Sequence, residues 1–228
     1  MSTKQNLFRV RVWDLPTRLF HWSIAICFTG LVITGTVGNA ALVFHFRFGY
    51  AMLALLLFRI VWGLVGGHWS RFSSFLFSPK STLTYLKSNI SVAAAVGHSP
   101  LGALSVWAFL IFLCAQVTTG LVSDDEISFA GPLSHLVSNA TVSLATSYHS
   151  DIGKWILLAL VLVHIAAIVV HTRRKHRLVS AMLNGDKYLT TPAPVSRDNT
   201  LSRLLALIVF ALCAAFAYWV SSFTPTAF

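Results

Sequence analysis

The chain has 228 residues, of which 56% are hydrophobic and only 11% are charged. So few charges exclude a soluble globular domain and indicate an integral membrane protein. The formal net charge of +10 would suit a nucleic-acid-binding protein, but the positions of the basic residues, given below, argue against that class.

Five apolar runs follow a short basic and polar arm formed by residues 1–16. They cover approximately residues 18–37, 47–65, 101–122, 152–170 and 204–220. Each is long enough, with its flanks, for a helix that crosses a hydrocarbon core of about 30 Å. We expect part of the connection 66–98 to lie in the membrane interface and the connection 123–148 to carry a short surface helix.

The basic residues are distributed very unequally between the two membrane faces. With the N-terminus inside, fifteen of the 17 lysines and arginines fall in or near inner segments, and only Arg47 and Lys154 fall near the outer face. This asymmetry follows the positive-inside rule. It predicts a multi-pass protein of the bacterial inner membrane, with a cytoplasmic N-terminus and a periplasmic C-terminus. Anionic lipid supplies sufficient counter-charge, so we expect no nucleic-acid partner.

Four histidines sort into two pairs by their expected depth in the membrane. The first helix runs from the inner to the outer face, so His21 lies near the inner face. The second helix starts at the outer face, so His45 lies near that face. His149 and His164 are 15 positions apart, which is about 22 Å along an α-helix. We therefore predict an inner pair, His21 with His164, and an outer pair, His45 with His149.

Paired imidazoles inside a membrane suggest a metal. Such residues are costly there and are functional-site candidates by default, and two neutral imidazoles suit Fe, Cu or Zn. No Asp, Glu or Cys accompanies them, which favours haem, a metal group with its own equatorial ligands. The alternative is that each histidine only hydrogen-bonds a neighbouring helix. His171, two helical turns beyond His164 on the same face, is an alternative inner ligand.

Two glycines support a large flat ligand. Gly49 and Gly153 each follow a histidine of the outer pair by four residues. In each case the next helical turn has no side chain on that face, which leaves room for a macrocycle.

Three arginines are candidates for contacts with haem propionates. Arg59 interrupts an apolar run 14 residues after His45, at about the depth of the inner pair, and a buried arginine needs an anion. Arg18, one turn before His21, could do the same, and Arg47 could serve the outer haem. The remaining histidines fall in connections or at the ends of apolar runs, and we interpret them as interfacial: His68, His98, His135 and His176.

Five stretches of the chain share the pattern of a known family. They are VWDLPTRLFHW (12–22), HFRFGY (45–50), FRIVWG (58–63), GHSPLG (97–102) and RLVSAMLNGDK (177–187). They resemble bacterial cytochrome b561 and the cytochrome b subunits of nickel-iron hydrogenases, over about residues 8–188. The resemblance implies an all-α four-helix membrane bundle that holds two b-type haems, each with two histidine ligands, and exchanges electrons with quinone. Carried over, the ligands fall on His21, His45, His149 and His164.

Two features depart from that pattern. The spacing of 15 between His149 and His164 exceeds the 14 expected from some relatives, so the entry to this helix differs by a residue. The fifth apolar run is an addition to the four-helix core. We therefore expect a dihaem membrane domain over residues 1–188, and a linker with an additional C-terminal transmembrane helix over residues 189–228.

The main functional prediction is a transmembrane dihaem cytochrome b that carries electrons between the quinone pool and a redox partner. The acidic residues 124–126 could meet a basic periplasmic c-type cytochrome, or could be only a solvated face. One alternative is the membrane-anchor subunit of a hydrogenase or another dehydrogenase. Another is a haem-free, histidine-lined transporter or proton path, which usually carries an intramembrane carboxylate; none of the five runs has one in its middle. Whether the chain counts as an enzyme depends on its partner.

Overall fold

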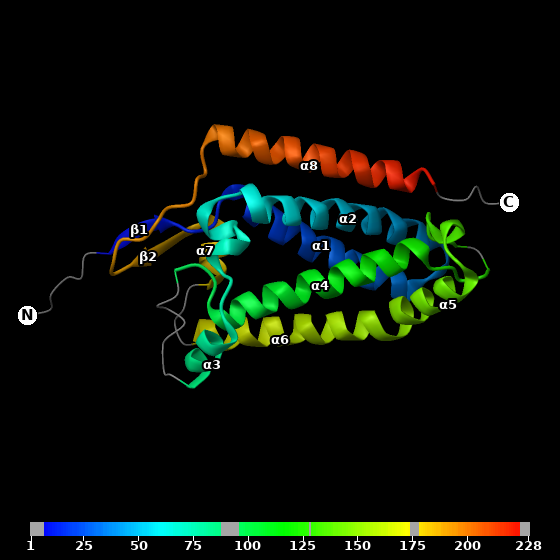
Figure 1. Ribbon diagram of the computed structural model, residues 1–228, viewed down its shortest axis with the longest axis horizontal. Coiled ribbons are helices and arrows are strands. Elements are labelled where there is room, and N and C mark those ends of the chain that lie inside the picture. The colour runs from blue at the N-terminus through cyan, green and yellow to red at the C-terminus, as the bar shows by residue number, and fades with distance from the viewer. Residues whose placement is uncertain (1–6, 88–95, 128, 174–177, 224–228) are drawn as a thin grey trace, which may run out of the picture. The chain divides into compact units, whose positions relative to one another are not determined.

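The computed structural model describes residues 7–87, 96–127, 129–173 and 178–223. Among these residues, five helices are long and apolar enough to cross a membrane (Figure 1). They are α1 (Leu15–Val37), α2 (Leu42–Val65), α4 (Pro100–Val122), α6 (Lys154–Arg173) and α8 (Thr200–Ser221). The predicted all-α membrane fold with a fifth helix is confirmed.

Shorter elements connect the long helices. They are β1 (Phe8–Arg11), η1 (Asn39–Ala41), η2 (His68–Ser70), η3 (Phe72–Ser74), α3 (Pro79–Lys87), η5 (Ser134–Leu136), α5 (Asn139–Ser147), the π-helix η6 (Tyr148–Gly153), α7 (Leu178–Asn184) and β2 (Asp186–Leu189). The short helix expected within 123–148 is α5, which begins at the N-cap Ser138, whose side chain accepts from Thr141 N. It continues through η6 into α6.

The second long helix begins earlier than predicted. The apolar run suggested a start near residue 47, but α2 begins at Leu42, so His45 lies inside the helix and not before it. Hydropathy places a boundary at Arg47, whereas helical hydrogen bonding continues past an arginine. The guanidinium of Arg47 lies 5.5 Å from the centre of the Phe44 ring. The chain turns between α1 and α2 at Gly38, with φ of 67°, where glycine is favoured.

The chain divides into two compact units. Unit 1 comprises Met1–Leu19, Ile60–Trp107 and Val163–Leu207, and unit 2 comprises Phe20–Arg59, Ala108–Leu162 and Ile208–Phe228. Each of the five long helices contributes one segment to each unit.

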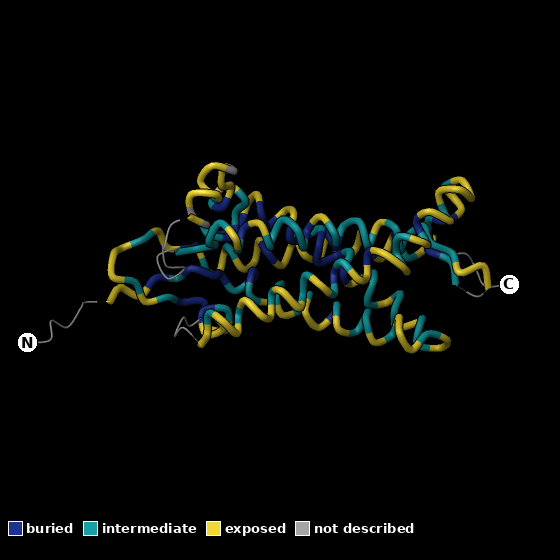
Figure 2. Tube along the Cα trace, turned by 90° about the horizontal axis from the view of Figure 1, so that it is seen from below, coloured by how far each residue is buried: buried dark blue, intermediate teal, exposed yellow. Residues whose placement is uncertain are grey.

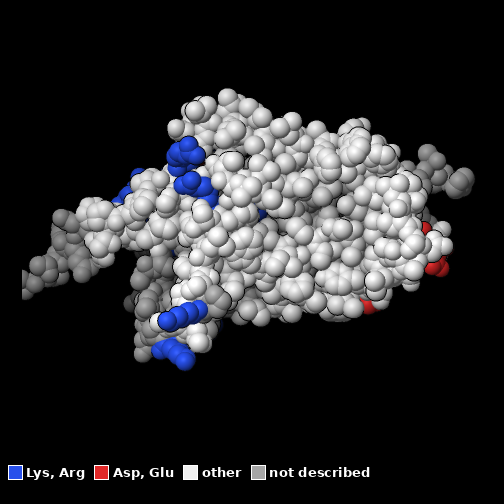
Figure 3. Space-filling view, in the orientation of Figure 1, with Lys and Arg blue, Asp and Glu red and all other residues white. Residues whose placement is uncertain are grey.

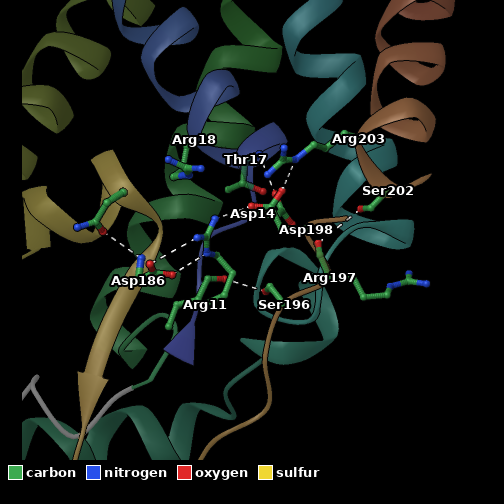
Figure 4. A network of polar contacts seen from close by, with 12 residues as sticks. Arg11, Asp14, Thr17, Arg18, Asp186, Ser196, Arg197, Asp198, Ser202 and Arg203 are labelled. Carbon is green, nitrogen blue, oxygen red and sulfur yellow. Dashed lines mark hydrogen bonds and ion pairs between the residues drawn. The ribbon is translucent and has the colours of Figure 1, made fainter. Parts of the chain in front are cut away.

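In unit 1, the N-terminal arm forms a strand that the sequence did not reveal. β1 pairs antiparallel with β2, with Phe8 opposite Leu189 and Arg11 opposite Asp186. Ion pairs join this ribbon to the following linker (Figure 4): Arg11 Nε lies 2.6 Å from Asp186 Oδ1, and its Nη1 lies 2.6 Å from Asp198 Oδ2. The segment after β2 is therefore fixed against the N-terminal strand.

Asp14 ties together three elements of unit 1. Its buried carboxylate caps α1 by accepting from Thr17 N at 2.8 Å, the usual role of an aspartate at this position. It also accepts from Ser70 Oγ at 2.8 Å, Gly67 N at 3.1 Å and Trp62 Nε1 at 3.3 Å. One side chain thus holds the start of α1 against the end of α2 and the η2 turn.

In unit 2, segments of all five long helices pack together, and their outward sides are apolar. The rings of Phe58 on α2 and Phe210 on α8 have centres 6.0 Å apart. Only 6% to 44% of the apolar window of each long helix is buried, and Figure 2 shows exposed residues along these helices. Such surfaces suit a lipid solvent. The described acids of unit 2 are Asp124, Asp125, Glu126 and Asp151, and the acids seen in Figure 3 lie in an area without lysine or arginine.

Candidate functional site

His45 on α2 and His149 on η6 face each other within unit 2. Their ring centres are 6.1 Å apart, with an angle of 85° between the ring planes. A metal–imidazole bond is about 2 Å long and a ring nitrogen lies about 1.1 Å from its ring centre, so two imidazoles on one ion have centres about 6 Å apart. The observed separation is compatible with a single ion between the two rings, and it is also within the range of ordinary ring packing.

The Nδ1 atoms of both rings are directed at backbone carbonyls. His149 Nδ1 lies 2.8 Å from Gln116 O, and His45 Nδ1 lies 3.1 Å from Leu31 O. With its proton on Nδ1, each ring donates to a carbonyl and leaves the lone pair of Nε2 for a metal. Histidine ligands are usually oriented in this way by an outer hydrogen bond. Both members of the outer pair therefore have the tautomer that leaves Nε2 available to a metal.

Two glycines missed by the sequence analysis make room for these rings. A Cβ on Gly120 would lie 2.7 Å from His149 Cε1, and a Cβ on Gly35 would lie 3.0 Å from His45 Cε1. α4 carries no histidine in its apolar part from which the depth of Gly120 could be counted. Both glycines let a neighbouring helix contact an imidazole edge.

The two glycines that we predicted beside the macrocycle have different surroundings. A Cβ on Gly49 would meet no described atom within 4 Å, which agrees with open space on that face. A Cβ on Gly153 would meet Gln116 Oε1. Gly153 therefore admits the Gln116 side chain, another residue that the sequence analysis missed, although a lone amide in an apolar span is itself a signal.

The residues predicted around the inner haem fall in both units. In unit 2, His21 packs edge-to-face against Trp22, with ring centres 5.1 Å apart, and Arg59 is only 5% exposed. In unit 1, His164 is half-buried, and Arg18 Nη1 donates to Leu183 O. An anionic group beside Arg59 stays a prediction.

Among the described residues, no further histidine joins the outer pair to form a group of three. In unit 1, His98 packs against Trp13 and Phe75, with ring centres 4.7 Å and 4.4 Å away. His68 lies in η2, His135 in η5 and His171 in the last turn of α6. His176 lies outside the described residues.

Unit 2 also holds a cavity of about 620 Å³ between α1, α2 and α8. Small residues form much of its wall, among them Ala51, Ala214 and Ala217, and Arg47 and Tyr218 supply polar groups. Its lining is mostly apolar, and the cavity is more open than enclosed.

The donor set of unit 2 restricts the kind of metal group. In the described part of the chain, no group of three or more His, Cys, Asp or Glu side chains could hold an ion. Two imidazoles alone suit a metal whose equatorial ligands come from a macrocycle, as in haem. Together with the membrane-spanning helices, this donor set agrees with a multi-pass membrane cytochrome.

Similarity to known protein sequences identifies the family. The chain belongs to the prokaryotic cytochrome b561 family, whose model matches residues 12–185. It is similar to the probable Ni/Fe-hydrogenase B-type cytochrome subunits of Cupriavidus necator (28% identical, covering 81% of this chain and 89% of the relative) and Bradyrhizobium diazoefficiens (24% identical, 78% and 85%). It is also similar to the probable Ni/Fe-hydrogenase 1 B-type cytochrome subunit of Escherichia coli (25% identical, 79% and 91%). No solved structure matches it.

Proposed function

We propose that the chain binds two b-type haems and passes electrons through the membrane between quinone and a redox partner. The observation that carries this proposal is the His45–His149 pair, with ring centres 6.1 Å apart. The second haem rests on the sequence argument that places His21 and His164 at one depth. Haem supplies reversible one-electron transfer at its iron.

Residues of the chain orient the haem ligands, exclude water from the two sites and balance the charge of the propionates. Leu31 O and Gln116 O fix the imidazole tautomers of the outer pair. Arg59 and Arg18 are proposed to hold the propionates of the inner haem, and Arg47 those of the outer haem, with Gly49 leaving a face open to the macrocycle. Apolar helix surfaces exclude water from the path, so that electrons and not protons are conducted.

We propose that quinone occupies the cavity between α1, α2 and α8. Reduction of a quinone to quinol takes two electrons and two protons, and quinol oxidation releases them, so the reacting oxygens need polar neighbours. Arg47 and Tyr218 offer donors beside an apolar wall. Ala214→Phe should fill the cavity and slow quinol oxidation at unchanged haem content. Ala215→Phe, on an exposed position of the same helix, is the matched control. Equal rates in both variants would remove quinone from this cavity.

Two partner classes are supported by different observations. Relatives named as Ni/Fe-hydrogenase B-type cytochrome subunits favour a hydrogenase. The exposed acids Asp125 and Glu126 suit a basic periplasmic c-type cytochrome. Affinity purification from native membranes separates them: copurified nickel and iron–sulfur proteins support the hydrogenase, and a protein with covalently bound haem supports the c-type cytochrome.

The proposed placement is the bacterial inner membrane, with the N-terminus in the cytoplasm and the C-terminus in the periplasm. It is supported by the excess of lysine and arginine in the segments assigned to the inner side. A reporter that is active only in the cytoplasm, fused after Phe228, should be inactive.

Haem stoichiometry tests the proposal directly. The purified protein should contain two b-type haems per chain, measured as the pyridine haemochrome. His45→Ala or His149→Ala should remove one haem, and His21→Ala or His164→Ala should remove the other. A protein that binds no haem would return the histidines to helix packing or proton transfer, and loss of the inner haem in His171→Ala but not in His164→Ala would reassign that ligand.

A further inference from the structure

Gln116 is the one amide side chain in the mostly apolar helix α4, and it contacts His149 twice. Its Nε2 donates to His149 O at 2.9 Å, and its own backbone carbonyl lies 2.8 Å from His149 Nδ1. A polar side chain at this depth is costly unless it has a specific partner. Here the partner is one residue of the outer histidine pair, engaged through both its main chain and its ring.

The contact falls on an irregular turn. His149 lies in the π-helix η6, which spans Tyr148–Gly153 between α5 and α6. A π-turn holds one more residue than an α-turn. Because each residue of an α-helix turns by about 100°, a regular helix over the same residues would rotate His149 by about that angle relative to α6. The π-turn therefore decides whether the ring faces His45.

Side chains bond to the carbonyls of this turn and of the residues before it. Gln116 bonds to His149 O, and Ser150 Oγ donates to Thr146 O at 2.8 Å. Carbonyls that accept from such groups are a recognised cause of local departures from α-helical geometry. Of these two hydrogen bonds, only the one from the Gln116 amide comes from another helix.

Two glycines shape the contact between α4 and η6. Gly120, one turn after Gln116 on the same face, leaves room for the edge of the His149 ring, because a Cβ there would lie 2.7 Å from Cε1. Gly153 leaves room for the Gln116 amide, because a Cβ there would meet Oε1. Both glycines are needed for Gln116 and His149 to lie side by side.

We propose that Gln116 is a positioning residue for the outer haem: its amide stabilises the π-turn that directs His149 Nε2 towards the iron site shared with His45. This inference rests on the proposed function, since it assigns an outer support to a ligand of that function. The π-turn also accounts for the spacing of 15 residues between His149 and His164, because it takes up one extra residue without rotating the histidine away.

The test compares Gln116→Met with the wild-type protein. Methionine keeps the length of the side chain and removes the amide. Loss of an outer support of a metal ligand costs about 10–100-fold in affinity, so haem loss from the outer site to excess apomyoglobin should be faster by about that factor. The g-values of the ferric outer haem should also shift, because they depend on the angle between the two imidazole planes. Thr29→Val, which removes a hydroxyl bonded to Ala25 O within α1, should change neither measurement.

A deletion keeps the test decisive if Gln116→Met does not accumulate. Deletion of Asp151 should convert η6 into a regular α-turn, in which His149 O is bonded within its own helix and the Gln116 amide has no further role. In the deletion background, haem loss should then be the same with and without the Gln116→Met substitution. Unequal rates there, or unchanged g-values and haem loss in Gln116→Met alone, would overturn the role of Gln116. Absence of the outer haem from the wild-type protein would instead refute the proposed function.

Discussion

Replacement of Asp14 by asparagine should destabilise the protein strongly, although the two side chains have the same shape. Oδ1 accepts from Thr17 N and Trp62 Nε1, and Oδ2 accepts from Gly67 N and Ser70 Oγ. Asparagine has one acceptor oxygen, so two of these four donors would face an amide NH₂ group. Hydrogen bonds to a charged group contribute about 1.5–3 kcal/mol each, and a buried donor without a partner costs about 1–3 kcal/mol.

The expected loss in the free energy of unfolding is about 3 kcal/mol, at the lower end of that sum. The Ser70 hydroxyl can turn towards Thr17 Oγ1, which lies 2.7 Å away, so only the Gly67 N–H would lack an acceptor. Unfolding can be followed by tryptophan fluorescence during titration of detergent-solubilised protein with sodium dodecyl sulfate.

The control for the lost charge is Glu126→Gln, at an exposed position, which should change stability by less than about 0.5 kcal/mol. A double-mutant cycle of Asp14→Asn with Ser70→Ala should give a coupling energy above about 1 kcal/mol. If Asp14→Asn costs no more than Glu126→Gln, or if the cycle gives no coupling, Asp14 does not hold α1 and α2 together as described.

Three further predictions concern the glycines and two charged residues outside the membrane. Gly120→Ala and Gly35→Ala should each lower haem content by up to one haem per chain, because the added methyl group would lie 2.7 Å and 3.0 Å from an imidazole carbon. Burial lowers the pKa of Lys187 to about 8. Between about pH 8 and pH 10 the unfolded chain therefore binds more protons than the folded chain, and the free energy of unfolding should rise with pH. Lys187→Met should abolish this rise. Burial would raise the pKa of Asp186, but hydrogen bonds from Arg9 and Arg11 outweigh it and hold the pKa below its usual value. The folded chain then binds fewer protons, so the stability lost in Asp186→Asn at neutral pH should disappear as the pH falls below about 4, and an unchanged difference at low pH would contradict this ion pairing.

The long helices could be predicted because their signal is local. About twenty consecutive apolar residues suffice to identify a spanning helix, and all five predicted runs are helical. The ends of the helices were predicted less accurately, as the start of α2 at Leu42 illustrates. Hydropathy places the end of a helix at a charged residue, whereas backbone hydrogen bonds can continue past it. The division of the chain at residue 188 stays a prediction.

Part of the site could be predicted because depth in a membrane is a linear function of sequence along a helix. Counting from one membrane face brings His45 and His149 to the same level, and the structure brings their rings together. Such counting finds residues whose side chains are chemically distinctive in an apolar helix, such as histidine. It does not find Gly120, whose role is to leave room for the His149 ring because it has no side chain. It also does not find the π-turn at His149, which changes the register within a helix.

Contacts between distant segments left no pattern in the sequence. β1 has only four residues, and its partner β2 lies far along the chain, as the separation of 175 residues between Arg11 and Asp186 shows. The buried carboxylate of Asp14 was visible only as one acid in a basic arm.

The pairing of β1 with β2 has a consequence for the order of events during synthesis. The first strand leaves the ribosome 175 residues before the residue that its Arg11 binds, which at about 5–20 residues per second is a wait of about 10–35 s. Throughout that interval the segment that becomes β1 has no partner strand, beside a membrane that is receiving apolar helices. Its alternating arginines, Arg9 and Arg11, discourage pairing with other chains, as charged residues on edge strands do. When Asp186 and Asp198 emerge, they form ion pairs with the same arginines. Arg9 and Arg11 therefore first discourage pairing with other strands and later stabilise the pairing of β1 with β2.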